Sequence, residues 1–151
     1  MKVIITCLFL LCSISYVHGI ESKDNNATIK ELYCPKTTDL KQTNLKWNAE
    51  TEIKWQAESS FVTKIASFEG AQWQGIKVGQ ISCIYKGADN NTFPVALQSN
   101  HMFTQPESQN WIKSGNSYNC LDNNVENCPL YPHMEKPLPS NLYDMLHELK
   151  N

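Results

Sequence analysis

The chain has 151 residues, a formal net charge of −2 and no arginine, since all 13 basic residues are lysines. Arginine forks carry much of the bidentate recognition of phosphates and bases, so this mildly acidic chain is not expected to bind nucleic acid. A chain of this length is expected to form one domain with a modest core.

Residues 1–19 have the pattern of a secretory signal peptide. Lys2 precedes an apolar run at residues 3–11, and a small residue, Gly19, stands at the expected cleavage point. A spanning helix needs about 20 apolar residues, and this run is shorter. No second apolar stretch follows. We therefore expect an exported chain, residues 20–151, with no stable membrane span after cleavage. The expected location is the periplasm, or alternatively the medium as a secreted protein.

The exported part is expected to be mainly β. Residues 20–31 are polar and predict a flexible leader, and a β domain is expected over residues 32–128. Leu45 and Trp47 alternate with polar residues, as do the apolar residues of 53–57, and this period of two is typical of half-buried strands.

Further strands are expected at residues 63–68, at 74–78 after a break at Gly70, and at 79–85. Residues 93–97 are the expected partner of 79–85, because the Gly- and Asn-rich residues 86–91 between them have turn chemistry. Pro94 lacks an N–H group, which predicts an edge position for its strand.

The end of the chain has a different pattern. Four prolines at residues 129–139 predict an extended linker. Ser140 can cap a helix over residues 140–150. Its apolar residues fall at helical spacing on one stripe, which must dock on the domain or on a partner: Leu142, Met145, Leu146 and Leu149. The expected fold is thus a small disulfide-tied antiparallel β-sandwich or sheet with a short C-terminal helix.

Four cysteines remain after cleavage, namely Cys34, Cys83, Cys120 and Cys128. In an exported chain they imply two disulfides with three possible pairings. We favour Cys120–Cys128 as a local clip and Cys34–Cys83 as the long tie. The alternative is a metal site of Cys120, Cys128 and His133, but zinc-binding cysteines usually stand two to four residues apart.

No catalytic motif is evident in the sequence. It contains neither a His-Glu-x-x-His pair nor a Gly-x-Ser-x-Gly elbow nor a phosphate-binding loop. Glu50, Glu52 and Glu58 form an acidic cluster, for which exposed strand ends are the simplest explanation, although a glycosidase pair stays open. We therefore expect a protein that is not an enzyme and has no metal and no cofactor.

Tryptophan is abundant for a small β domain, with four residues in the chain. Trp47, Trp55 and Trp73 either pack the core or form a surface for a protein partner, because tryptophan is favoured at binding hot spots. A sugar-binding platform made of the same rings is a third interpretation. The apolar stripe of residues 142–149 is the second candidate partner surface, and a second copy of the chain is one candidate partner.

Several short motifs resemble one known family. These are Cys34 with Pro35, FEGAQWQG at 68–75, GQISCIY at 79–85, YNC at 118–120 and NCP at 127–129. Together they resemble the EirA family of small exported proteins from intracellular Gram-negative bacteria, which is associated with the Dot/Icm type IV secretion system. The resemblance implies a non-enzymatic periplasmic protein that supports effector secretion, and it implies no catalytic residue. The alternatives are a secreted effector or inhibitor acting on host targets, and a carbohydrate-binding β module.

We expect Cys83→Ser to lower the free energy of unfolding by about 4 kcal/mol. The bond between Cys34 and Cys83 closes a long loop and so restricts the unfolded chain, and the substitution removes this restriction. Thermal unfolding of the oxidised variant measures the change. A melting temperature equal to that of the unsubstituted protein would contradict the pairing.

Overall fold

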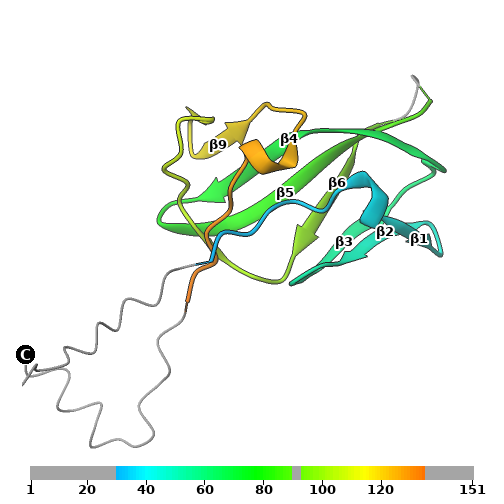
Figure 1. Ribbon diagram of the computed structural model, residues 1–151, viewed down its shortest axis with the longest axis horizontal. Coiled ribbons are helices and arrows are strands. Elements are labelled where there is room, and N and C mark those ends of the chain that lie inside the picture. The colour runs from blue at the N-terminus through cyan, green and yellow to red at the C-terminus, as the bar shows by residue number, and fades with distance from the viewer. Residues whose placement is uncertain (1–29, 90–92, 135–151) are drawn as a thin grey trace, which may run out of the picture.

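The computed structural model describes residues 30–89 and 93–134, and these form one antiparallel sheet of nine strands (Figure 1). The prediction of a mainly β, antiparallel fold is confirmed, as a sheet and not as a sandwich. The strands are β1 (Lys41–Thr43), β2 (Lys46–Glu50), β3 (Lys54–Ser59), β4 (Ile65–Gly75), β5 (Val78–Gly87), β6 (Val95–Ser99), β7 (Phe103–Thr104), β8 (Trp111–Ser114) and β9 (Ser117–Cys120).

The strands lie in the order β1-β2-β3-β6-β5-β4-β9-β8, and β7 pairs with the start of β5. Strands β4, β5 and β6 follow one another as hairpins, and β3 lies beside β6, which is a Greek-key arrangement. The predicted pairing of the 79–85 strand with the 93–97 strand is confirmed. The predicted edge position is wrong, because β6 lies between β3 and β5. Pro94 precedes β6, so its missing N–H costs the sheet no hydrogen bond.

Strand β4 is continuous where the sequence predicts a break. Its pairing with β5 shifts by one residue between Phe68 and Gly70, which is a β-bulge. Gly70 has a φ of 142°, and a Cβ at this position would collide with the carbonyl oxygen of Cys120 in β9. Glycine is therefore required here for close strand approach, and it does not end the strand.

Two expected strand segments are tight turns. Asn44 and Leu45 join β1 to β2 with φ angles of 50° and 64°, so Leu45 is not in a strand. Ile76 and Lys77 join β4 to β5, which places a turn inside the segment predicted as a strand at 74–78. The positive φ of Leu45 is unfavourable for leucine, so the residue type at this position does not indicate a turn. A third tight turn joins β8 to β9, where Gly115 has a φ of 61°.

The inward faces of the strands form the core. In β6 every second residue is buried, and in β3 Trp55 and Ala57 are buried as the alternation predicts, whereas Ser59 at the end of β3 is exposed. The core includes Trp55, Phe68, Trp73 and Tyr85, and Trp55 stacks on Phe103 at 6.2 Å between ring centroids.

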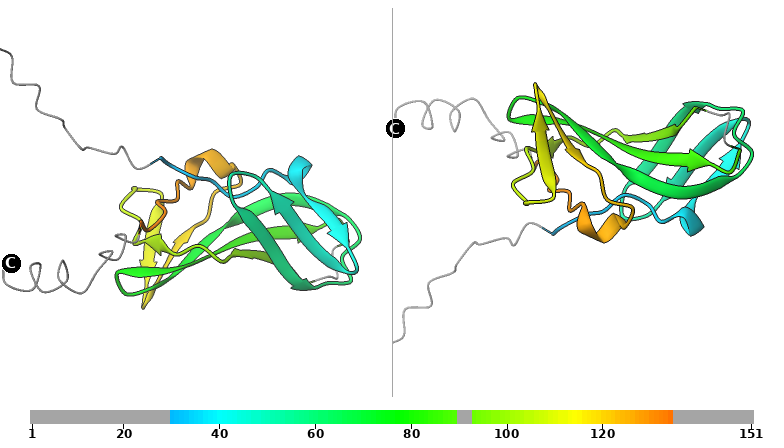
Figure 2. Two further views of the ribbon diagram at one scale, coloured as in Figure 1. Left: turned by 90° about the horizontal axis from the view of Figure 1, so that it is seen from below. Right: turned by 90° about the horizontal axis from the view of Figure 1, so that it is seen from above.

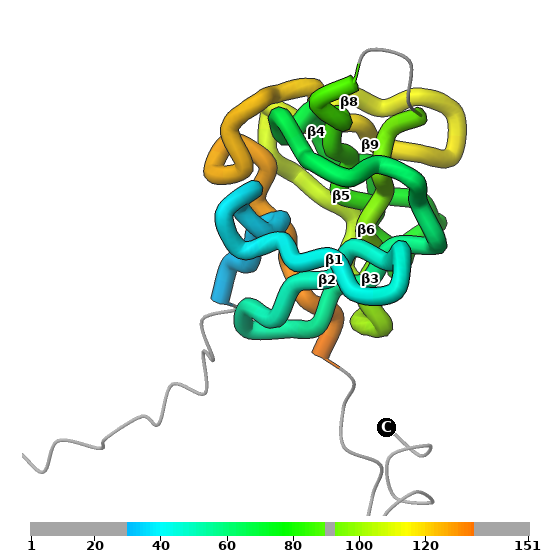
Figure 3. The backbone as a smooth tube through the Cα atoms, turned by 90° about the vertical axis from the view of Figure 1, so that its right-hand side faces the viewer, coloured from blue at the N-terminus to red at the C-terminus, as the bar shows by residue number. Residues whose placement is uncertain are grey.

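Irregular segments, not a second sheet, cover the core. Residues 30–40, with the 3-10 turn η1 (Thr37–Asp39), and residues 121–134, with η2 (Val125–Asn127), lie on the same side of the sheet (Figures 2 and 3). Leu32 and Leu130 exchange main-chain hydrogen bonds of 2.9 and 2.8 Å. Leu130 is buried, so the domain includes the first residues of the segment predicted as a linker from residue 129.

Some predictions fall outside the described residues. These are the signal peptide at 1–19, most of the leader at 20–31, the part of the linker after residue 134 and the helix at 140–150. The described part of the chain contains two 3-10 turns and no α-helix, and none of its helical segments has the length and apolarity needed to cross a bilayer.

We expect Gly70→Ala to destabilise the fold by about 3 kcal/mol, because the added methyl group strains the backbone and pushes β9 away from β4. The matched control is Gly115→Asn. Nothing lies within 4 Å of a Cβ at Gly115, and asparagine tolerates its positive φ. Thermal unfolding should separate the two variants; equal melting temperatures would show that the bulge does not require glycine.

Candidate functional site

The tryptophans proposed as a partner surface lie in the core. Trp47, Trp55 and Trp73 are only 7%, 2% and 1% exposed. They do not form a surface in this structure, and the exposed coplanar array that a tryptophan sugar platform needs is not present among the described residues. The structure thus favours the core-packing interpretation of these rings.

Three of the four indole N–H groups donate to main-chain carbonyls, whereas that of Trp55 is buried without a partner among the described residues. Trp47 donates to Val62 at 2.9 Å, Trp73 to Phe103 at 3.1 Å, and Trp111 to Pro129 at 3.2 Å. The hydroxyl of Tyr85 donates to Pro35 at 2.7 Å in the same way, and burial raises its pKa. Tyr85 therefore stays protonated and has a structural role.

The favoured disulfide pairing is confirmed. Cys34 bonds Cys83 with 5.7 Å between Cα atoms, and Cys120 bonds Cys128 with 5.8 Å. The first bond ties the leading segment to the central strand β5, and the second ties η2 to β9. Their sulfur atoms are therefore not available to a metal, and His133 in the described chain has no ligating cysteine beside it. The two disulfides are compatible with an extracytoplasmic location.

The three glutamates of the acidic cluster are exposed and do not converge. Glu52 pairs with Lys30 at 2.8 Å, Glu50 lies 3.9 Å from Lys54, and Glu58 lies on β3. None of the three is buried, so none lies in the apolar pocket that a catalytic carboxylic acid needs. The geometry fits the simpler explanation of exposed charges at strand ends.

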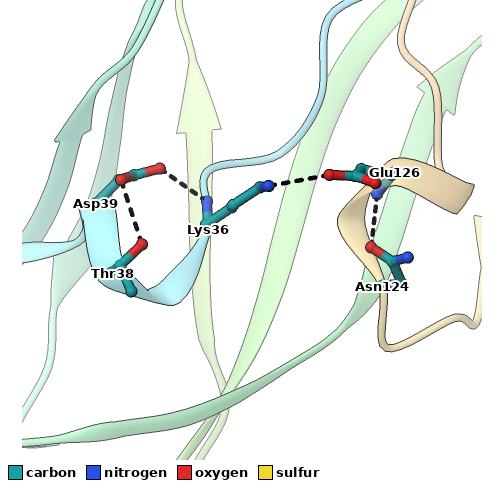
Figure 4. Close-up of polar contacts among 5 residues, drawn as sticks. All are labelled: Lys36, Thr38, Asp39, Asn124 and Glu126. Carbon is teal, nitrogen blue, oxygen red and sulfur yellow. Dashed lines mark hydrogen bonds and ion pairs between the residues drawn. The ribbon is translucent and has the colours of Figure 1, made fainter.

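A polar bridge joins the two 3-10 turns that cover the core (Figure 4). The ammonium group of Lys36 contacts Glu126 at 2.9 Å, and this contact raises the pKa of Lys36. Asp39 accepts a hydrogen bond from the main-chain N–H of Lys36, and Asn124 accepts one from that of Glu126. Nearby, the N–H of Asn124 and the amide of Asn127 lower the pKa of Asp122. These groups satisfy one another and serve the fold.

A hollow lies on the opposite, outward face of the sheet. It is a groove of about 660 Å³ along β3 and β6. Its floor is mostly uncharged, with the outward residues Gln56, Ala96 and Gln98, and Gln80 of β5 beside them. The two segments that cover the core, residues 30–40 and 121–134, lie on the other side of the sheet.

Two phenylalanines stand at one end of this groove, which we name the aromatic end. Phe61 follows β3 and Phe93 precedes β6, and because these strands are antiparallel both rings lie at the same end. They are 86% and 90% exposed. Lys46 and Glu58 also line the groove. Paired exposed rings beside a groove are typical of a protein-binding surface.

Sequence reasoning missed the aromatic end. Phe61 was not assigned to any element, and Phe93 was assigned to a strand. The sequence gives no signal for their exposure, because each ring continues the inward phase of its neighbouring strand: Phe61 follows buried Trp55 and Ala57 at intervals of two, and Phe93 precedes buried Val95 and Leu97 in the same way. Only the antiparallel pairing of β3 with β6 brings the two rings together.

No family model matches this chain, and no curated protein or solved structure matches it. The resemblance to the EirA family therefore stays a prediction that rests on the short motifs given above.

We expect Phe61→Ser and Phe93→Ser to change the free energy of unfolding by less than about 0.5 kcal/mol each, because the rings are exposed and bury little area. The comparison variant is Phe68→Ser, which removes a ring that is 3% exposed and should cost at least about 3 kcal/mol. Chemical denaturation measures all three. A large loss at Phe61 or Phe93 would mean that these rings support the fold.

Proposed function

We propose that this protein is a non-enzymatic periplasmic accessory protein that supports effector secretion by a type IV (Dot/Icm) system through protein–protein contacts. The observation that carries the contact function is the aromatic end, where Phe61 and Phe93 are exposed beside a groove. The secretion role rests on the motif resemblance to the EirA family.

The aromatic end has the chemistry of a protein-binding surface. Phenylalanine is enriched at the centres of protein interfaces, and large exposed apolar groups mark contact sites. Lys46 and Glu58, which line the same groove, supply charges of both signs for a polar rim. The partner that fits is therefore a protein with an apolar projection surrounded by polar groups.

The scaffold suits work outside the cytoplasm. Two disulfides hold the covering segments on the sheet, so the surface is presented on a rigid support. The predicted signal peptide at 1–19 supplies export, and the predicted helix at 140–150 supplies a second apolar stripe for contact. Loss of either disulfide would loosen a covering segment and leave the outward face in place.

Gene deletion with complementation tests the proposal. Effector translocation should fail in the deletion strain without cell lysis, and the unsubstituted gene should restore it. A Phe61→Ser/Phe93→Ser double variant should fold, reach the periplasm and not restore translocation. The matched control is Ile76→Ser, which removes an exposed apolar side chain at the opposite end of β4.

Two outcomes would refute the proposal. Normal translocation in the deletion strain would remove the secretion role. Protein found in the culture medium and not in the periplasmic fraction would favour the alternative of a secreted effector or inhibitor that acts on host targets.

A further inference from the structure

The outward face of the sheet carries a cross-strand row of uncharged polar side chains, which we name the amide row. Successive members are direct partners in the strand pairing, so the row runs perpendicular to six neighbouring strands. Five members carry amides and one carries a hydroxyl: Asn48, Gln56, Gln98, Ser82, Gln72 and Asn119.

Neighbouring residues extend the same chemistry. Gln80 of β5 lies opposite Gln74 of β4, two residues along the strands from Ser82 and Gln72, so both face outward beside the row. No charged side chain interrupts the row between β2 and β9. Lys46 and Glu58 belong to the aromatic end of the groove, whereas the row crosses the groove at Gln56 and Gln98.

The row keeps free hydrogen-bonding capacity. Gln98 donates to the Ser82 hydroxyl at 3.0 Å, and Gln72 donates to the Asn119 side-chain oxygen at 2.9 Å. The side chain of Gln56 has no hydrogen-bond partner among the described residues. An amide offers two donors and two acceptor sites, so these contacts fix the orientation of two members and leave donors and acceptors facing outward.

This pattern has the chemistry of a glycan site. Sugar hydroxyls and N-acetyl amides both donate and accept hydrogen bonds, as the row does. Adjacent strands are about 4.8 Å apart, which is close to the length of one pyranose unit in a β-1,4-linked chain. A chain laid across the strands would therefore meet about one row residue per sugar. The absence of charge along the row gives no basis for binding phosphate or carboxylate.

We propose that the amide row binds a neutral β-1,4-linked glycan carrying N-acetyl groups, in the form of a cell-wall glycan strand. This function is separate from the protein contacts of the aromatic end and does not use Phe61 or Phe93. Glycan binding by the amide row would anchor the domain to the cell wall and leave the aromatic end free to contact a protein partner.

Titration with the hexamer of β-1,4-linked N-acetylglucosamine tests the site by NMR. The side-chain NH2 signals of Gln56, Gln98 and Asn119 report on the row directly, and we expect them to shift together. A peptide-binding face would leave these signals unmoved by the sugar. Unmoved signals at millimolar hexamer, or shifts confined to other parts of the protein, would overturn the proposal.

Substitution of one row member gives the second test. Gln98→Glu keeps the shape of the side chain, removes its NH2 donor and places a negative charge between Gln56 and Ser82. Affinity for the hexamer should fall roughly tenfold. The matched control is Gln109→Glu, which makes the same change in the turn before β8 and should bind as the unsubstituted protein does. Equal affinity of both variants would overturn the assignment to the row.

Two further comparisons identify the ligand and separate the two surfaces. The glucose hexamer with the same linkage should bind more weakly, and equal binding would overturn the N-acetyl assignment. Purified cell-wall sacculi should retain the unsubstituted protein and the Phe61→Ser/Phe93→Ser variant but not Gln98→Glu. If the Phe61→Ser/Phe93→Ser variant binds sacculi but does not restore translocation, the defect lies in the aromatic end and not in the amide row.

Discussion

The structure depends on hydrogen bonds from buried aromatic side chains to main-chain carbonyls. A single sheet has an apolar face that must be covered, and here irregular segments cover it. Such segments lack strand partners for their carbonyls, and an unpaired buried carbonyl is costly. The indole of Trp111 and the hydroxyl of Tyr85 supply donors to Pro129 and Pro35 in these segments. The indoles of Trp47 and Trp73 donate in the same way to Val62, after β3, and to Phe103 of β7. Each of these four rings thus fills the core and holds a neighbouring stretch of main chain, whereas the buried indole N–H of Trp55 has no hydrogen-bond partner among the described residues.

Much of the fold follows from the sequence because burial imposes a period of two. The alternation at β3 and β6 predicts strands, and the turn residues after β5 predict its partner. The disulfides follow from an even cysteine count and from spacing. Gly70 shows the limit of such reasoning, because glycine serves equally as a strand break or as a bulge. The contact with Cys120, far along the chain, decides between the two.

The candidate sites depend on register, which the sequence does not specify. The amide row includes Gln56, Gln98 and Gln72, which are far apart in the chain. No local sequence motif marks any of them as part of a site. They form a row only because β6 lies between β3 and β5, and the position of Pro94 favoured the wrong strand order. The sequence also does not show which large apolar rings are buried, so the tryptophans are candidates for a partner surface as well as for the core. The exposed rings are Phe61 and Phe93 instead.

The bridge between Leu32 and Leu130 has a mechanical consequence. Both ends of the described domain leave close to this pairing, where Thr104 and Met102 also hydrogen-bond Tyr131 and His133, so tension applied to the two termini loads these few main-chain bonds first. Separation could then proceed only to Cys34 on one side and Cys128 on the other, where covalent bonds to β5 and β9 transfer the load into the sheet. The domain would therefore lengthen by a few residues at each end under a pulling force and then resist, with its outward face unchanged.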